Sequence, residues 1–403
     1  MINFKELAST YKTPLYIYDL DHMKAQYEEL KSAFKGRKSL LAFAIKSNSN
    51  LSIIKHFAAL GSGADCVSIG EVRRAFLAGV PSYKIIFSGV GKSDDEIREA
   101  IERDILYINV ESEAELGRVE LIAKELGAKC RISIRVNPNI DPKTHPYIST
   151  GLHDNKFGVE IDAAKRMYIR ANNSEHLDPV GIHFHIGSQL TELEPIYESA
   201  VIVADLVRSL QSIKIELKFF DIGGGLGVVY KDETTINPYD YAQAILGALK
   251  GLDLTVISEP GRFLTANGGY FLTKVLYEKQ NGAKRFVVVD GAMNDLLRPS
   301  LYKAYHRIEA ITQSKTEMSE ADVVGPVCES GDFFAKSYPL PILEHNDLLL
   351  IHSAGAYGFG MGSNYNTRGR SAEIAISEGK AKLIRRREEF EDLIALEKEY
   401  LDN

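Results

Sequence analysis

The sequence has few cysteines, no excess of positive charge and no long apolar run. Three cysteines among 403 residues cannot form a disulfide framework, and they fit a reducing compartment. A formal net charge of −7 gives no broad electrostatic basis for binding nucleic acid. No apolar stretch approaches the roughly 20 residues of a membrane span, and the N-terminus lacks the apolar core of a secretory signal. We therefore expect a cytoplasmic protein with no nucleic-acid or membrane partner.

The composition is that of an ordinary globular protein, with 45% hydrophobic and 26% charged residues. Its length is enough for two domains. Between about residues 35 and 265, short strand-like runs alternate with amphipathic helix-like segments. The runs are SLLAFAIK, GADCVS, KIIFSG, LYINV, KCRISIRV, PVGIHFHIG, FFDIGGG and TVISEPG. Eight strand–helix units in series predict an α/β fold, a parallel (β/α)8 TIM-type barrel.

After about residue 268 the pattern changes to strand-like runs separated by turns, such as KRFVVVDG and DLLLIHSAG. This pattern predicts a C-terminal all-β domain, which the N-terminal strand TPLYIYDL is expected to join. The predicted parts are therefore an N-terminal segment 1–30, a barrel 31–267, and a β-rich domain 268–403 that ends in a helix. The long connection 138–158 is a candidate lid.

The run LLAFAIKSN ends an apolar strand on a lysine. Strand alternation would place Ala42, Ala44 and Lys46 on one face. One interpretation is that Lys46 ends the strand and points into water, as lysines usually do. The other is that Lys46 forms a Schiff base with a carbonyl cofactor or substrate.

Polar residues collect at the ends of the later strands, where a barrel carries its function. GIHFHIGSQ offers His183 and His185 two residues apart. A metal would need a third ligand, and no carboxylate follows at a fixed spacing, so we expect no metal site. His183 is interpreted as a hydrogen-bonded core histidine, whereas a flat imidazole at a strand end can also stack on an aromatic cofactor.

Two glycine turns follow the seventh and eighth predicted strands, GGGLG at 223–227 and Gly261 in SEPGR. Each alone is compatible with a simple tight turn. Together they lie where many barrels hold a phosphate on backbone N–H groups. Glu259 is either a capping or surface acid, or a carboxylate that keeps a pyridine nitrogen protonated.

Eight motifs occur in order along nearly the whole chain: FAIKSN, GADCVSIGEV, HFHIGSQ, DIGGGLG, EPGR, VDGAMNDLLRPSLY, GPVCESGDFF and GAYGFGMGSNYN. This set resembles the diaminopimelate decarboxylase family, whose members are pyridoxal-phosphate-dependent decarboxylases with the alanine-racemase-type fold. The sequence departs from the family at Phe43 and Ser47, where Tyr and Ala are more usual. Neither departure touches Lys46.

The resemblance implies a bound pyridoxal 5'-phosphate. Lys46 would hold it as an internal aldimine, His185 would stack on its ring, and Glu259 would pair with the ring nitrogen. The resemblance assigns the remaining cofactor contacts to Ser188, Gly225, Pro260, Gly261, Arg262 and Tyr357.

The resemblance also implies the reaction, decarboxylation of meso-2,6-diaminopimelate to L-lysine and CO2 through an external aldimine and a quinonoid carbanion. This is the last step of lysine biosynthesis. Cys328 would protonate the carbanion from the partner subunit of a homodimer with shared active sites. The substrate contacts it implies are Arg262, Arg298 and Tyr302 for the distal carboxylate, Glu329 for the distal ammonium, and Tyr357.

Three alternatives stay open. Racemases of this fold usually place an arginine at the ring nitrogen, so Glu259 favours decarboxylation. Decarboxylases of ornithine, arginine, lysine or carboxynorspermidine would share the cofactor, but two arginines beside Glu329 favour a distal group with both charges. A non-catalytic binding homologue could have lost the cofactor lysine, whereas Lys46 and Cys328 are both present.

Overall fold

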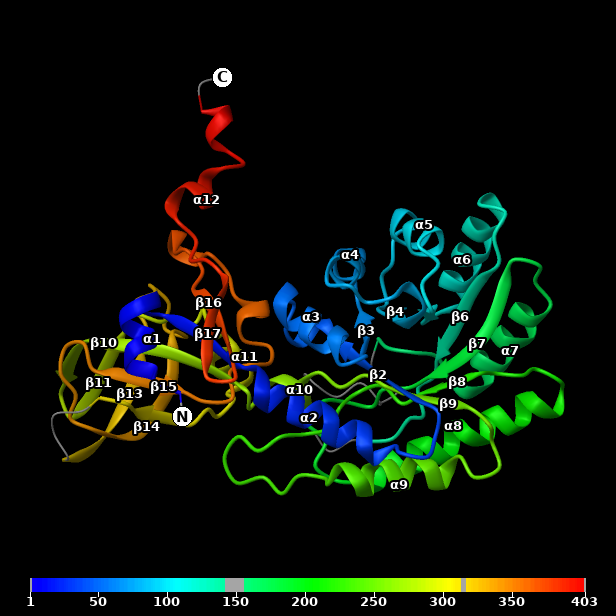
Figure 1. Cartoon of the computed structure of the whole chain (residues 1–403), viewed down its shortest axis with the longest axis horizontal. Helices are drawn as coiled ribbons and strands as arrows, with labels where there is room; N and C mark the ends of the chain where they lie inside the picture. The colour runs from blue at the N-terminus through cyan, green and yellow to red at the C-terminus, as the bar shows by residue number, and fades with distance from the viewer. Residues whose placement is uncertain (1, 142–155, 313–316, 402–403) are drawn as a thin grey trace. The chain divides into compact units, whose positions relative to one another are not determined.

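The computed structural model describes residues 2–141, 156–312 and 317–401 (Figure 1). The chain divides into two compact units. A barrel unit comprises Lys24–Val228 and Thr234–Phe263, and a β-sheet unit comprises Met1–Met23, Val229–Glu233 and Leu264–Asn403. The limits expected from the sequence at residues 30 and 267 stay predictions. Most of the candidate lid, residues 142–155, lies outside the described residues.

The barrel unit confirms the prediction of eight parallel strands. Each strand pairs with the next, and the last pairs with the first through Ser39 and Val256, which closes the barrel. The strands are β2 (Ser39–Ala44), β3 (Gly63–Cys66), β4 (Ile85–Phe87), β5 (Tyr107–Val110), β6 (Cys130–Arg135), β7 (Leu177–His183), β8 (Phe219–Asp221) and β9 (Thr255–Ser258). The ends of these strands therefore meet at one mouth.

The helices that follow the strands begin where the sequence supplies a capping side chain. Ser68, Ser93 and Ser112 each accept a hydrogen bond from a backbone N–H of the first helical turn, which satisfies a donor that the helix leaves free. The helices are α2 (Leu20–Ala33), α3 (Leu51–Ala59), α4 (Ile69–Leu77), α5 (Asp94–Glu102), α6 (Glu113–Glu125), α7 (Ile161–Asn172), α8 (Glu194–Ser212) and α9 (Pro238–Ala248). Among the described residues, no helix is both long enough and apolar enough to cross a membrane.

The β-sheet unit is built around one sheet of nine strands. The N-terminal strand β1 (Leu15–Asp19) lies between β10 and β16, so the prediction that it joins the C-terminal strands is confirmed. The other strands are β10 (Gly269–Asn281), β11 (Lys284–Val289), β12 (Ile308–Ala310), β13 (Met318–Val324), β14 (Phe333–Pro341), β15 (Leu348–Ile351), β16 (Ala372–Ser377) and β17 (Lys380–Arg385). Leu15, Leu272 and Ile374 are fully buried in its core.

The elements of the β-sheet unit that were not predicted include the helix α1 (Phe4–Tyr11), the strands β12 and β14, and the short helix α11 (Arg298–Tyr302). β14 contains Pro339 and Pro341, which argue against a central strand. It tolerates them because it is the last strand of the sheet, where one edge needs no backbone donors. The expected C-terminal helix is shorter than predicted: α12 covers Phe390–Ile394, and a single 3-10 turn follows at Lys398–Tyr400.

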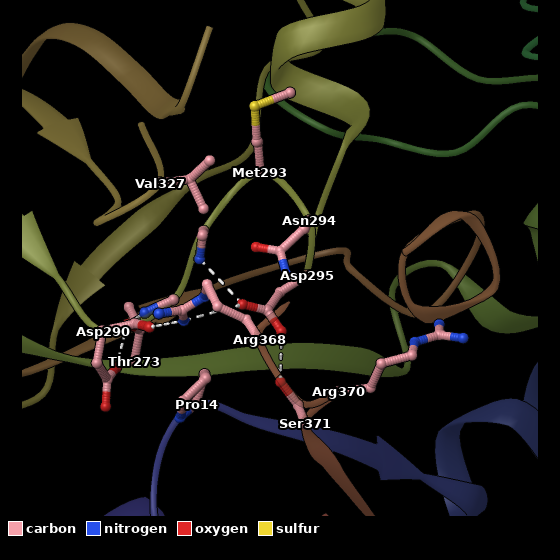
Figure 2. A network of polar contacts seen from close by, with 12 residues as sticks. Pro14, Thr273, Asp290, Met293, Asn294, Asp295, Val327, Arg368, Arg370 and Ser371 are labelled. Atoms are coloured by element: carbon pink, nitrogen blue, oxygen red, sulfur yellow. Dashed lines mark hydrogen bonds and ion pairs between the residues drawn. The ribbon is translucent and has the colours of Figure 1, made fainter. Parts of the chain in front are cut away.

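A polar network fixes the loop after β11 in the same unit (Figure 2). Arg368 donates a 2.6 Å hydrogen bond to the carbonyl of Asp290, and its guanidinium lies 3.9 Å from the carboxylate of Asp295. Asp295 also accepts hydrogen bonds from Ser371 Oγ (2.8 Å) and the backbone N–H of Ala292 (3.0 Å). These bonds hold the chain that leads into α11.

Candidate active site

Lys46 lies at the mouth of the barrel, but the strand does not reach it. β2 ends at Ala44, and Lys46 sits in the 3-10 turn Ile45–Ser47. The expected strand alternation therefore does not extend to Lys46, because the backbone leaves the extended conformation first. Lys46 Nζ lies 3.0 Å from Oδ2 of the fully buried Asp65, while its own side chain is 36% exposed. A lysine whose side chain is partly exposed is accessible to a carbonyl compound.

Asp65, on β3, was not singled out from the sequence. Burial raises the pKa of its carboxyl group, as does the charge of Glu259, and Lys46 offsets these effects only in part. A carboxyl group with a raised pKa beside an amine is suited to exchanging a proton with it.

Glu259 follows β9 and is buried against His183 of β7, with Nε2 and Oε2 3.2 Å apart. Burial raises the pKa of Glu259, but the interactions with His183 and Lys46 outweigh it and bring the pKa to about 2. Burial and the charge of Glu259 raise the pKa of neighbouring Asp221 well above its usual range. Of these two carboxyl groups, Asp221 therefore keeps the proton and Glu259 keeps the negative charge.

His183 does have carboxylate neighbours, contrary to the expectation from sequence spacing. Ligand atoms of His183, Asp221 and Glu259 all lie within 4.8 Å of one another. Both oxygens of Asp221 are already engaged, by the hydroxyl of Tyr107 at 2.8 Å and by the backbone N–H of Gly223 at 3.0 Å. We interpret the cluster as a hydrogen-bonded network in which one of the two carboxyl groups is ionised.

The glycine run after β8 has no room for side chains. A Cβ on Gly224 would lie 2.3 Å from the carbonyl oxygen of Glu259, and one on Gly225 would lie 2.4 Å from that of Gly187. Gly225 also has φ +116°, a conformation that other residues rarely adopt. The two glycine turns predicted from the sequence are thus packed closely together in space.

Ser188 and Arg262 meet beside these turns. Arg262 Nε and Nη2 donate to Ser188 Oγ at 3.2 and 3.0 Å. Arg262 is buried. A buried guanidinium beside glycine backbone forms a cradle suited to an anion such as a phosphate.

His185 lies just past the end of β7 and is partly buried. Burial lowers the pKa of its imidazole well below the usual value, and the nearby cations Arg135 and Lys46 lower it further. The ring is therefore neutral at physiological pH. Its backbone carbonyl accepts a 3.4 Å hydrogen bond from Arg135, which is itself paired with Glu111 at 3.1 Å.

The β-sheet unit carries the other predicted residues. Arg298 and Tyr302 share α11, and the buried Arg298 guanidinium lies 5.9 Å from the ring centre of Tyr302. Cys328 and Glu329 lie in the loop between β13 and β14, and both are exposed. Tyr357 has φ +55° in the loop after β15. The predicted residues therefore form two sets, one at the barrel mouth and one on α11 and nearby loops of the sheet.

Residues 20–266 match the family model "Pyridoxal-dependent decarboxylase, pyridoxal binding domain". Diaminopimelate decarboxylase of Campylobacter jejuni is 60% identical, over 99% of this chain and 100% of its own length. The diaminopimelate decarboxylase of Pseudomonas aeruginosa is 46% identical, over 98% of this chain and 95% of its own length.

The chain belongs to the diaminopimelate decarboxylase family.

Solved structures of the diaminopimelate decarboxylase family agree with this assignment. The enzyme of Helicobacter pylori, crystallised with L-lysine, superposes with a TM-score of 0.97 at 56% identity and covers 99% of this chain and all of its own. The enzyme of M. jannaschii, also with L-lysine, superposes with a TM-score of 0.93 at 40% identity. The match covers 98% of this chain and 94% of that one. A lysine/ornithine decarboxylase of Vibrio vulnificus gives 0.82 at 22% identity and shows the shared fold alone.

Sequence reasoning missed Asp65, Tyr107 and Asp221 at the barrel mouth. Each of them contacts a polar side chain from another strand or loop of the barrel. Asp65 had a usable signal, because it is a charged residue inside a predicted strand of mostly small and apolar residues. Tyr107 had none, because an aromatic residue in an apolar strand is expected in the core.

Proposed function

We propose that this protein binds pyridoxal 5'-phosphate and decarboxylates meso-2,6-diaminopimelate to L-lysine and CO2. The observation that carries the proposal is the set of groups at the barrel mouth: a partly open lysine, an anionic buried glutamate and a glycine cradle. A single small ligand with an aldehyde, a basic ring nitrogen and a phosphate matches all three.

The described residues fit this cofactor. Lys46 would attach its aldehyde carbon, and the neutral ring of His185 would stack on the pyridine. Ser188, Gly225 and the backbone of residues 259–262, which includes Pro260 and Gly261, would hold its phosphate together with Tyr357. When bound, the cofactor supplies an electron sink for the electrons that the departing CO2 leaves behind.

Glu259 would keep the ring nitrogen protonated. A carboxylate with a pKa of about 2 stays ionised throughout the physiological range, and it is buried where water does not screen it. Burial and the charge of Glu259 raise the pKa of Asp221, so Glu259 is the ionised member of this pair of carboxyl groups. This arrangement distinguishes the site from the racemases of the same fold, which usually have an arginine at this position.

The substrate contacts are proposed on the β-sheet unit and at Arg262. Arg262, Arg298 and Tyr302 would bind the distal carboxylate, because a guanidinium offers paired donors to a carboxylate. Glu329 would accept the distal ammonium, and Tyr357 would contact both substrate and phosphate. Cys328 would donate a proton to the carbon that has lost CO2, a step for which positioned acids supply about 10²–10⁴-fold.

We also propose a homodimer in which Cys328 and Glu329 of one copy serve the substrate held by the other. Mixing inactive Lys46→Ala and Cys328→Ala chains tests this arrangement. Random exchange should restore about a quarter of the wild-type activity, since half of the dimers would hold one intact site of two. Mixed dimers that form and stay inactive would contradict sharing.

The proposed substrate is tested by CO2 release from cofactor-loaded protein. The protein is offered meso-diaminopimelate, L-lysine, L-ornithine, L-arginine and carboxynorspermidine separately. We expect release from meso-diaminopimelate alone, with L-lysine as the product. Release mainly from a compound without the distal carboxylate would retain the cofactor chemistry and overturn the roles of Arg298 and Glu329.

A further inference from the structure

The loop that carries Cys328 and Glu329 is poorly anchored by apolar packing. It joins β13, which ends at Val324, to β14, which begins at Phe333. Cys328, Glu329 and the serine that follows are exposed, whereas Val327 is 7% exposed. The positions of Cys328 and Glu329 must therefore depend on polar contacts of the loop.

Asp332 supplies such contacts from the end of the same loop. It is only 5% exposed, and its two carboxylate oxygens accept hydrogen bonds from two different backbone segments. Oδ2 accepts from the N–H of Val327 at 2.7 Å, directly before Cys328. Oδ1 accepts from the N–H of Met293 at 2.7 Å, in the segment that leads into α11 (Figure 2 labels Met293 and Val327).

Both segments lie outside the strands, so their N–H groups lack ladder partners and need another acceptor when buried. The chain leaves space for this acceptor at Gly325. A Cβ there would lie 2.5 Å from Asp332 Oδ2, 2.6 Å from Oδ1 and 2.7 Å from the carbonyl oxygen of Gly291. Only glycine at this position lets the carboxylate reach both donors.

Further bonds complete the loop around Asp332. Its own N–H donates to the carbonyl of Glu329 at 3.0 Å, and the N–H of Glu329 donates to the carbonyl of Val327 at 2.8 Å. The N–H of Cys328 donates to Asn366 Oδ1 at 2.9 Å. Ser300 of α11 donates to the carbonyl of Gly331. The loop is thus tied to the segment around α11, and Asp332 accepts from both.

We propose that Asp332 is a positioning residue that fixes the loop carrying Cys328 and Glu329 against the segment of its own chain that leads into α11. The inference rests on the proposed function, because it takes Cys328 as the proton donor and Glu329 as a substrate contact. Asp332 itself does not touch the substrate. It acts through the backbone of residues 327–329 on one side and of residue 293 on the other.

The test is the isosteric change Asp332→Asn. The amide oxygen can still accept one of the two backbone N–H groups. The NH2 group would face the other N–H, so that hydrogen bond is lost and the two donors repel each other. We expect kcat to fall about 10- to 100-fold, the loss expected when a reacting group is misplaced by about 1 Å. In a Cys328→Ala background the same change should alter kcat less than about twofold, since the proton donor that Asp332 positions is already absent.

Asp322→Asn is the matched control. Asp322 is also a buried aspartate of the β13–β14 hairpin, and it accepts the N–H of Ser337 at 2.9 Å, away from the loop. We expect this change to lower the melting temperature and to leave kcat within about twofold. Independent effects of Asp332→Asn and Cys328→Ala on kcat would overturn the proposal, because a purely structural role predicts independence.

A second measurement needs no variant. In the wild-type protein, amide hydrogen exchange should be slower at Val327 and Met293 than at the exposed residue 330. Equal exchange at these positions would overturn the proposal even if Asp332→Asn does not fold. Full activity of Cys328→Ala would instead refute the proposed role of Cys328. Slow exchange at Val327 would then show that Asp332 holds the loop although Cys328 is not the proton donor.

Discussion

The two units of this protein hold their polar groups by different means. In the barrel unit, polar side chains near the strand ends pair with one another, as in Lys46–Asp65 and His183–Glu259. In the β-sheet unit, Asp332 and Asp295 instead accept hydrogen bonds from backbone N–H groups of loops. The barrel therefore fixes the ionisation state of its groups, whereas the sheet fixes the path of its loops.

This difference predicts two kinds of defect. Changes at the barrel mouth should alter how the cofactor is held, which is visible without substrate. Changes on the sheet, apart from those at Tyr357, should leave the bound cofactor unaltered and should alter turnover or substrate affinity. Variants of single residues in each unit test whether the two units differ in this way.

Lys46→Ala should have the largest effect. Without the amine, the cofactor is no longer attached, and the loss of intramolecular geometry should lower activity by roughly 10⁴-fold or more. Cofactor absorbance after gel filtration measures the loss directly. The control is Lys84→Ala, which removes a partly buried lysine that donates to the carbonyl of Gly61 and should retain cofactor and activity. Retention of cofactor and turnover by Lys46→Ala would refute the assignment of the barrel mouth.

Cys328→Ala should lower kcat by about 10²–10⁴-fold, because a positioned proton donor is lost. The absorbance of the bound cofactor should not change, since the residue lies on the β-sheet unit. Cys130→Ala is the control: this thiol is buried in β6, and its loss should leave kcat unchanged. Loss of cofactor in Cys328→Ala would contradict the division between the two units.

Arg298→Lys should raise KM for meso-diaminopimelate about 10- to 100-fold, because an ammonium cannot offer the paired donors of a guanidinium. Steady-state kinetics would show the change in KM with a smaller change in kcat. The exposed Arg307, which pairs with Glu309 at 3.0 Å, provides the control Arg307→Lys. An equal rise in KM in both variants would indicate a general charge effect rather than a contact.

Tyr107→Phe should have the smallest effect. It removes the 2.8 Å hydrogen bond to buried Asp221 and should lower the free energy of unfolding by about 1–2 kcal/mol. Urea denaturation measures this change. The control, Tyr168→Phe, removes a buried bond to the carbonyl of Gly181 in the same barrel and should cost a similar amount. Only Tyr107→Phe should also change the absorbance of the bound cofactor, through Asp221 and Glu259.

The sequence predicted the barrel better than the sheet for a physical reason. Each barrel strand is followed by its own helix, so the alternation of two periodicities along the chain marks every unit. Strands of the sheet pair over long separations, and β14 contains two prolines that obscure it. The short helix α11 begins with Arg298–Pro299 and has no side-chain cap to mark its start.

Local sequence determined which segments become strands and helices, and it placed Lys46, His185 and Glu259 at strand ends, because residue periodicity and capping act over a few residues. Tertiary structure alone decided which groups meet. Asp65 lies 19 residues from Lys46, His183 lies 76 from Glu259, and Tyr107 lies 114 from Asp221. Pairing of β2 with β3 brings Lys46 to Asp65, and the barrel brings the other two pairs together. The contacts of Glu259 with His183 and Lys46 decide that it holds the charge, whereas burial and the charge of Glu259 decide that Asp221 holds the proton.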